Sequence, residues 1–135
     1  MIAYEDAATA IDWLSAAFGF REAEGQRYTD ADGTVTHAEL SLDGATVYVA
    51  TPTPEYVSPR RHRETCDAAR RWLDNPWVID GVFVEVADLD AHHAVAAAAG
   101  ATILRAPEEP GVGFRIYSAE DLEGHRWMFG EATGD

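Results

Sequence analysis

The stretch IAYEDAATAIDWLSAAFG, residues 2–19, has the same plan as VFVEVADLDAHHAVAAAAG, residues 82–100. Each begins with a short apolar run, passes through an aspartate suited to cap a helix N-terminus, and ends in a glycine suited to end the helix. The capping aspartates, Asp6 and Asp88, are 82 positions apart. In the first stretch, apolar residues recur every three or four positions, as on a helix that buries one face. The sequence therefore predicts a strand–helix unit that is repeated once along the chain.

Three strands are expected after each of these helices. The first set covers 20–28, 34–42 and 45–50, and the second covers 101–105, 114–118 and 125–129. A tight hairpin is expected at Asp43-Gly44. The predicted fold class is α+β, built from two βαβββ modules of roughly 55 residues with their helices outside a curved sheet. An unrelated α+β sandwich with two helices is the alternative.

The charge of the chain excludes two classes of partner. With 24 acidic against 10 basic residues among 135, the net charge is −14, so a nucleic-acid backbone and an anionic membrane would both be repelled over most of the surface. All ten basic residues are arginine, which excludes Schiff-base chemistry through a lysine. Cys66 is the only cysteine, which excludes an internal disulfide and a thiolate zinc cluster. Because no leader or long apolar run is found, we expect a cytoplasmic protein.

The positive charge is concentrated in one part of the chain. Residues 55–76 hold five arginines against four acidic residues, which puts this segment at +1 and the rest of the chain at −15. The shift in composition predicts a linker between two acidic modules. We expect the first module over 1–54, an Arg- and Trp-containing linker over 55–78 and the second module over 79–135, within one structural domain.

Side-chain alternation along the predicted strands indicates which residues line a cleft. In 34–42 the apolar Ala38 and Leu40 share the face that we assign to the helix, so His37 and Glu39 point the other way. The same rule applied to the other strands gives an open face of polar and aromatic residues, which is typical of a small-molecule cleft. The candidate ligand-binding residues are His37, Glu39, Tyr48, Phe83, Glu85, Arg115, Tyr117, Arg126 and Met128.

Three runs of the sequence carry a resemblance to a known family. They extend over 4–20, 32–40 and 113–129 and account for most of the chain outside the linker. In them the chain resembles the vicinal oxygen chelate superfamily of glyoxalase I, bleomycin-resistance proteins and extradiol dioxygenases, and is most similar to its bacterial glyoxalase-like members. The resemblance implies two βαβββ modules that form a half-barrel cleft, usually in homodimers. It does not imply any one activity, because function on such a fold resides in the site.

Metal-dependent members of that superfamily hold an ion through four His or Glu ligands on inward strand positions. Carried over by position, the first ligand would lie upstream of Met1, and the others fall on Tyr48, Gly81 and Met128. None of these is the usual imidazole or carboxylate ligand, although a tyrosinate can bind iron. We therefore expect neither a metal nor another cofactor at the usual site.

A non-standard metal site is one catalytic alternative. His37 and Glu39 stand two apart on one strand face, and a third ligand would be available if His125 approached them. Such a site would serve a lyase, an isomerase or a dioxygenase. The simpler interpretation is a polar wall in which His37 is hydrogen-bonded to a carboxylate or a tyrosine.

A metal-free base is the second catalytic alternative. Glu39 or Glu85 on the open face would abstract a proton beside a carbonyl, with Arg115 or Arg126 as the partner of the resulting oxyanion. Without a metal this chemistry lacks its usual electrophile. The simpler expectation is that the two arginines are ion-paired to these two carboxylates.

Three further motifs have both a structural and a functional interpretation. The adjacent pair His92-His93 would point about 100° apart on a helix, so we expect a solvated face. The arginine run in 59–63 would recognise an anion in its functional interpretation, and the simpler expectation is a solvated loop or a contact with the acidic body of a partner subunit. The tryptophans Trp72, Trp77 and Trp127 would either stack on a flat ligand, preferably a cation, or bury the back of a sheet.

The sequence thus predicts a metal-independent protein that binds a small molecule in the cleft of a homodimer. The ligand is expected to be an antibiotic or another toxic compound, aromatic or cationic in character. One alternative is an enzyme of the same superfamily that uses a non-standard site around His37. Another is a subunit that docks on a partner protein through its Arg-rich linker.

Overall fold

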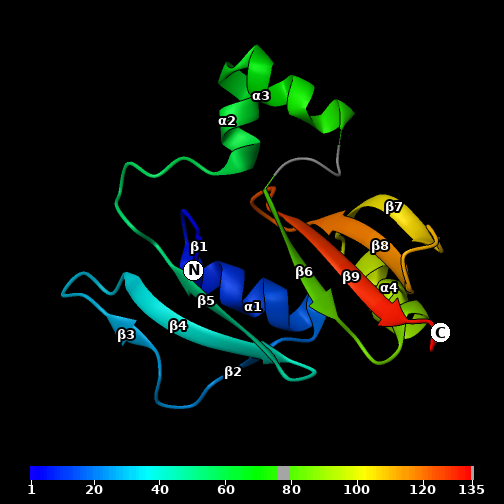
Figure 1. The fold of residues 1–135 in the computed structure, drawn as a ribbon. Coiled ribbons are helices and arrows are strands. Elements are labelled where there is room, and N and C mark those ends of the chain that lie inside the picture. The colour runs from blue at the N-terminus through cyan, green and yellow to red at the C-terminus, as the bar shows by residue number, and fades with distance from the viewer. Residues whose placement is uncertain (76–79, 135) are drawn as a thin grey trace.

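The chain folds into two sheets with the same strand order (Figure 1). The computed structural model describes residues 1–75 and 80–134. The first sheet consists, in order, of β1 (Ile2–Ala3), β5 (Ala45–Ala50), β4 (Val35–Leu42) and β2 (Arg21–Glu22), with β3 (Tyr28–Thr29) also paired to β4. The second consists of β6 (Gly81–Glu85), β9 (Arg126–Ala132), β8 (Phe114–Glu120) and β7 (Thr102–Glu108). In both sheets the strand before the helix pairs in parallel with the last strand of the module. The predicted α+β class with two βαβββ modules is confirmed.

The main helices begin and end at the predicted signals. The Asp6 carboxylate accepts a hydrogen bond from the Thr9 amide at the start of α1 (Ala7–Phe18), and Gly19 ends that helix at φ 79°. The Asp88 carboxylate caps α4 (Leu89–Ala98) in the same way. Each cap satisfies backbone amides that have no partner within the helix.

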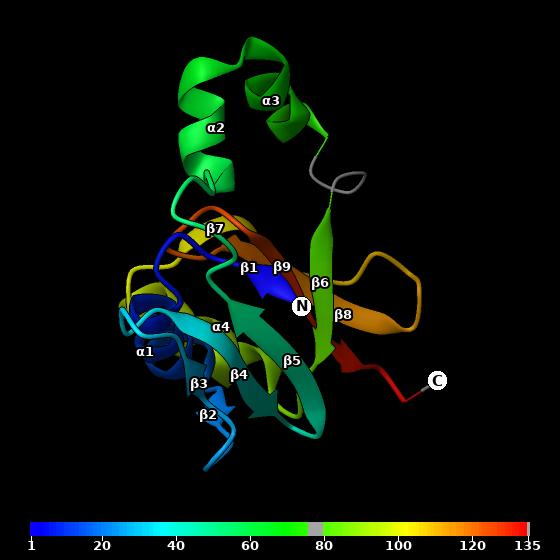
Figure 2. The ribbon, with the colours of Figure 1, turned by 90° about the vertical axis from the view of Figure 1, so that its left-hand side faces the viewer.

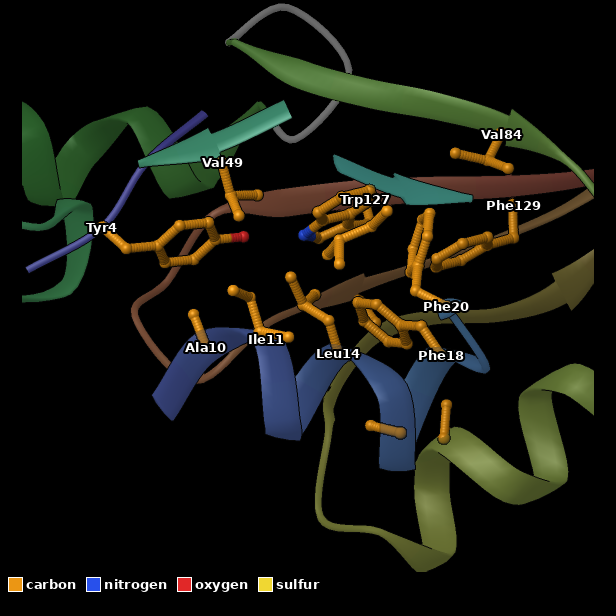
Figure 3. Packing of buried hydrophobic residues seen from close by; sticks show 14 of the residues in the cluster. Tyr4, Ala10, Ile11, Leu14, Phe18, Phe20, Val49, Val84, Trp127 and Phe129 are labelled. Carbon is orange, nitrogen blue, oxygen red and sulfur yellow. The ribbon is translucent and has the colours of Figure 1, made fainter. Parts of the chain in front are cut away.

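One hydrophobic core joins the two modules (Figure 3). The helices α1 and α4 each lie against the sheet of their own module, and they also pack against each other. The Phe18 ring at the end of α1 meets Trp127 and Phe129 of β9 with ring centroids 5.6 and 4.8 Å apart. Phe20 adds a third ring against Trp127. Because aromatic residues of the first module are buried by the last strand of the second, neither module has a core of its own.

Two short helices and a 3-10 turn connect the modules, and we refer to residues 59–74 as the strap. It comprises α2 (Pro59–Thr65), α3 (Asp67–Arg71) and η1 (Trp72–Asp74), and it lies at one end of the sheets, as Figure 2 also shows. None of the helices in the described part of the chain is long and apolar enough to span a membrane.

The arginine run of the strap is not a solvated loop, which corrects the sequence-based expectation. It forms α2, and its side chains bind to this chain's own body. Arg60 donates to the carbonyl oxygens of Asp121 and Leu122 at 3.1 and 2.8 Å, and Arg61 pairs with Glu5. These contacts hold the strap against the body of the chain, while the side chains of Arg60 and Arg61 remain 44% and 60% exposed, so docking of a partner on the strap stays a prediction.

Two predicted open-face residues lie on the helix side of the second sheet. Tyr117 is fully buried, and its hydroxyl is 2.6 Å from His92 Nδ1 on α4. Arg115 pairs with Asp90 of α4 at 3.0 Å and with Glu131 at 3.5 Å. The expected pairing of Arg115 with Glu39 or Glu85 is therefore wrong. The cause is the register with β9, which pairs Tyr117 with the buried Phe129 and so puts Tyr117 and Arg115 on the helix side of the sheet.

Candidate functional site

The first group of predicted site residues lies on the open face of the first sheet. The ring of His37 on β4 lies between those of Tyr28 and Tyr48, tilted against both, with ring centroids 5.8 and 5.3 Å apart. Its Nε2 atom is 3.6 Å from a carboxylate oxygen of Glu39, which is paired across the strands with Tyr48. The group forms a short, solvent-facing row of aromatic rings with one carboxylate beside it.

The second group lies on the open face of the second sheet. Phe83 on β6 is paired with Met128 on β9, and its ring lies over Gly130, where an added Cβ would come within 2.6 Å of it. The Phe114 ring meets Phe83 edge-on at 5.4 Å. Glu85 is exposed at the end of the same strand. Within 1–75 and 80–134, no hydrogen bond, ion pair or ring contact connects this group with the first.

A cavity of about 320 Å³ lies where the strap meets the start of β9. Its apolar walls come mainly from the strap and from the segment that leads into it: Tyr56, Val57, Pro59, Ala69, Trp72 and Leu73. The Trp72 side chain is half exposed and meets the His62 ring edge-on at 5.7 Å. An apolar hollow of this size, with an aromatic ring at its edge, is suited to a small organic molecule.

The polar lining of this cavity comes from both the strap and the sheet. It consists of His62, Arg63, Asp80, His125 and Arg126. Arg63 binds both carboxylate oxygens of Glu120 at 3.0 and 3.1 Å, and so connects the strap to β8. The His125 ring is within 2.6 Å of the Ala3 carbonyl oxygen. Of the nine predicted site residues, Arg126 is the one that lines this cavity.

A buried carboxylate stabilises the turn beside the cavity. Asp121, in the turn between β8 and β9, accepts hydrogen bonds from the Tyr4 hydroxyl at 2.6 Å and from the Trp127 indole at 3.0 Å. Its other oxygen accepts from the backbone amides of Glu123 and His125. Burial and the adjacent Asp121 charge raise the pKa of Tyr4, so this hydroxyl stays a donor. The bond from Tyr4 connects the N-terminal segment to the turn beside the cavity, and the other three hold the turn itself together with the start of β9.

Comparison with known proteins settles the family. The family model of the Glyoxalase/Bleomycin resistance protein/Dioxygenase superfamily matches residues 1–129. The chain belongs to this superfamily. Uncharacterized proteins Mb0911c of Mycobacterium bovis and Rv0887c of Mycobacterium tuberculosis are each 32% identical to it over 127 residues, or 94% of this chain. Those matches extend over 77% and 69% of the two mycobacterial proteins.

Solved structures of this superfamily have the same fold. TioX from Micromonospora sp. ML1 is 34% identical, with a TM-score of 0.69 over 99% of this chain and 94% of TioX. TnmS3 from Streptomyces sp. CB03234 is described as an antibiotic binding protein and is 16% identical to this chain. Its TM-score is 0.65, and the match covers 98% of this chain and 91% of the TnmS3 chain. At that identity TnmS3 shows the likeness of fold alone.

The usual metal site of the superfamily does not fit the residues of this member. Of the three corresponding positions, Gly81 has no ligand atom in a side chain, and Met128 offers a soft thioether. The Tyr48 ring lies tilted against that of His37 at the open face of the other sheet. Across the described residues, no three His, Cys, Asp or Glu side chains gather as a metal site would require. His125, the proposed third ligand beside His37, is hydrogen-bonded to Ala3.

Several residues around the cavity were not foreseen as site residues. Tyr56, Val57 and Arg63 belong to the linker, which holds none of the nine candidate ligand-binding residues. The presence of Trp72 in the linker was the one local signal for a ligand. Trp127, by contrast, is fully buried in the core, and Trp77 lies outside the described residues. His92 is also packed, between Tyr117 and the Phe18 carbonyl, which corrects the expectation of a solvated face.

Proposed function

We propose that this superfamily member is a binding protein for a small organic molecule and that the cavity beneath the strap is its principal site. The observation that carries this proposal is the cavity itself. It combines six apolar wall residues with an arginine-lined floor, and ion pairs from Arg61 and Arg63 hold the strap in place. Binding in such a hollow requires shape and apolar contact and no chemical step.

The comparisons support an antibiotic or another toxic compound as the ligand class. TnmS3 is described as an antibiotic binding protein, so the fold is compatible with that role. Sequestration needs only tight binding, which the apolar walls supply by burying ligand surface. A planar aromatic ligand would stack on Trp72, whose exposed ring lies at the cavity edge.

Binding is proposed to be independent of metal. Tyr48, Gly81 and Met128 do not provide the usual ligand set. The cavity is lined by carbon, imidazole, guanidinium and one carboxylate group, that of Asp80, and no three His, Cys, Asp or Glu side chains of the described residues gather there as a metal site would require. Ligand affinity should therefore be unchanged when the protein is purified with or without a chelator.

We further propose that the protein is a cytoplasmic homodimer in which the open faces of the two sheets are covered. Tyr28, Tyr48 and Phe83 are large, and each is at least 42% exposed in the single chain. Aromatic surface of this kind, gathered on two faces, favours association with a second protein surface. A second copy brings the residues of both predicted groups into an interface. A single free cysteine is in keeping with a reducing compartment.

Calorimetric titration with 2-naphthamide, a neutral two-ring probe, tests the principal site. We expect binding to the wild-type protein and loss of binding in Val57→Trp, which fills the cavity from a half-exposed wall position. Val95→Trp is the matched control, since Val95 is about equally exposed on α4 and away from this cavity. Equal affinity for both variants would place the site elsewhere, and binding of neither this amide nor the corresponding acid, 2-naphthoate, to the wild type would contradict the proposed function.

A further inference from the structure

Arg126 is buried, and the hydrogen-bond donors of its guanidinium group are unused. Its side chain is only 5% exposed, and it lines the cavity beneath the strap. Within the described part of the chain, none of its three guanidinium nitrogens has a hydrogen-bond partner. Arginine stays charged in proteins and offers five N–H donors in a fixed fork, so such a group needs an acceptor.

The nearest carboxylate is already occupied. Glu120 is the cross-strand neighbour of Arg126 and lies on the same face of the sheet. Both of its oxygens are bound by Arg63 at 3.0 and 3.1 Å, and Arg60 approaches one of them to 3.9 Å. Three arginines thus surround one carboxylate, which leaves the site locally positive within a chain of net charge −14.

A second unused polar group lies on the same face. The Ser118 hydroxyl is buried and has no hydrogen-bond partner among the described residues. Ser118 is paired with Met128 and is therefore the diagonal neighbour of Arg126. Ser118 lies outside the lining of the cavity, whereas Arg126 belongs to it, so the unpaired Arg126 is the donor that indicates a ligand with an acceptor group.

The energetic argument favours an anion over a neutral group. Burial penalises the charged guanidinium and lowers the pKa of Arg126 below its usual range. In this conformation each of its three nitrogens is itself almost fully buried. A carboxylate matches the guanidinium fork with two parallel hydrogen bonds and neutralises its charge.

We propose that the cavity selects small aromatic acids and that Arg126 binds their carboxylate. This inference rests on the proposed function and specifies its ligand class. Arg126 has a long, flexible stem, and its rotation into the adjoining cavity brings the guanidinium to the ligand, while Trp72 contacts the aromatic ring. The ligand is thus expected to carry a negative charge, whereas the sequence predicted an aromatic or cationic ligand.

The test compares 2-naphthoate with its neutral isostere 2-naphthamide by calorimetry near neutral pH. In the wild type we expect the acid to bind about tenfold or more tightly than the amide, as charged hydrogen bonds allow. In Arg126→Gln the two affinities should become nearly equal. Arg71→Gln is the matched control, because it removes the same charge from an exposed position on α3 and should keep the preference for the acid.

The two proposals fail in different ways. If the acid and the amide bind equally to the wild type, the carboxylate inference is overturned and the binding function stands. If neither compound binds, the binding function is overturned and the inference with it.

A thermal melt of Arg126→Met without ligand gives an independent readout. Replacing an unpaired buried charge by an apolar side chain of similar length should raise the melting temperature, by about 3 °C. A fall in melting temperature would contradict the inference, because it would show that Arg126 has a partner within the folded chain.

Discussion

At the scale of single residues, Asp121 has the largest predicted effect on stability. One carboxylate oxygen accepts from both Tyr4 and Trp127, and the other accepts from two backbone amides. In Asp121→Asn, one of these oxygens becomes an NH2 group, which then faces two donors in a buried site. We expect a loss of about 3 kcal/mol in the free energy of unfolding. Urea denaturation followed by tryptophan fluorescence measures it.

The control for Asp121 is Tyr4→Phe, which removes one donor and leaves the carboxylate with three. We expect a smaller loss of about 1–2 kcal/mol from this variant. Equal losses from the two variants would contradict this prediction. They would show that the hydrogen bonds from Trp127 and from the two backbone amides to the Asp121 carboxylate add nothing to the bond from Tyr4.

His92 predicts a pH dependence of stability. Burial is the main cause that lowers its pKa in the folded protein, while the Phe18 carbonyl opposes this and the nearby His93 adds to it. In the unfolded chain a histidine has a pKa of ~6.5, which is higher than the pKa of His92 in the folded protein. The unfolded state therefore takes up the proton first as the pH falls. The contribution of His92 is therefore complete above about pH 6.5 and is lost as the pH falls below it.

The variant His92→Gln should have a melting temperature that falls less than that of the wild type between about pH 7.5 and 5.5. His93→Gln should change that slope less than His92→Gln does, because burial, the main cause of the lowered pKa of His92, stays in place in this variant. Parallel slopes for all three proteins would remove His92 as the source of the pH dependence.

At the scale of secondary-structure elements, the contact between the strap and the β8–β9 turn decides whether the cavity exists. Gly124 in that turn has φ +88°, and an added Cβ would come within 2.9 Å of the Arg60 backbone nitrogen. The Arg60 amide itself donates to the Glu123 carbonyl. Only glycine permits both the backbone conformation and this close approach.

We expect Gly124→Ala to loosen the strap. It should lose about 1 kcal/mol from the positive φ and at least about 1 kcal/mol more from the clash with α2. Hydrogen exchange should be faster in residues 59–74. Gly33→Ala is the matched control, since Gly33 has φ +82° with no atom near its would-be Cβ. Similar exchange of the strap in both variants would contradict the proposed contact.

The elements also show what the sequence could predict. Capping aspartates, terminal glycines and helical spacing are local signals, and they predicted α1 and α4 correctly. The orientation of β8 was predicted wrongly because it depends on the register with another strand. Pairing with the buried Phe129 of β9 puts Tyr117 on the helix side, and no pattern within β8 itself contains that information.

The site was harder to predict than the fold. The cavity depends on contacts such as Arg63 with Glu120, which are 57 positions apart. Alternation placed Arg126 on the open face, but its lack of a partner follows only from the occupation of Glu120 by the strap. Ligand contacts by the nine predicted residues, like the division at 54 and 78, stay predictions.

At the scale of the whole molecule, the net charge of −14 opposes the proposed dimer. Two such chains repel each other over most of their surfaces, while apolar contact between open faces favours association. Salt screens the repulsion, since the Debye length falls from about 30 Å at 0.01 M to about 10 Å at 0.1 M. Dimerisation should therefore be tighter at higher ionic strength.

Analytical ultracentrifugation at low and moderate salt tests the salt dependence of this dimer. We expect the dimer dissociation constant to fall by about tenfold or more across that range, because screening reduces the repulsion between the two acidic bodies. Phe83→Glu should weaken the dimer at every salt concentration, because it puts a charge on an open face. Val95→Glu adds the same charge to exposed α4 and should shift the dissociation constant less. A dimer that weakens with added salt would contradict this account, since it would show that ion pairs between subunits outweigh the repulsion.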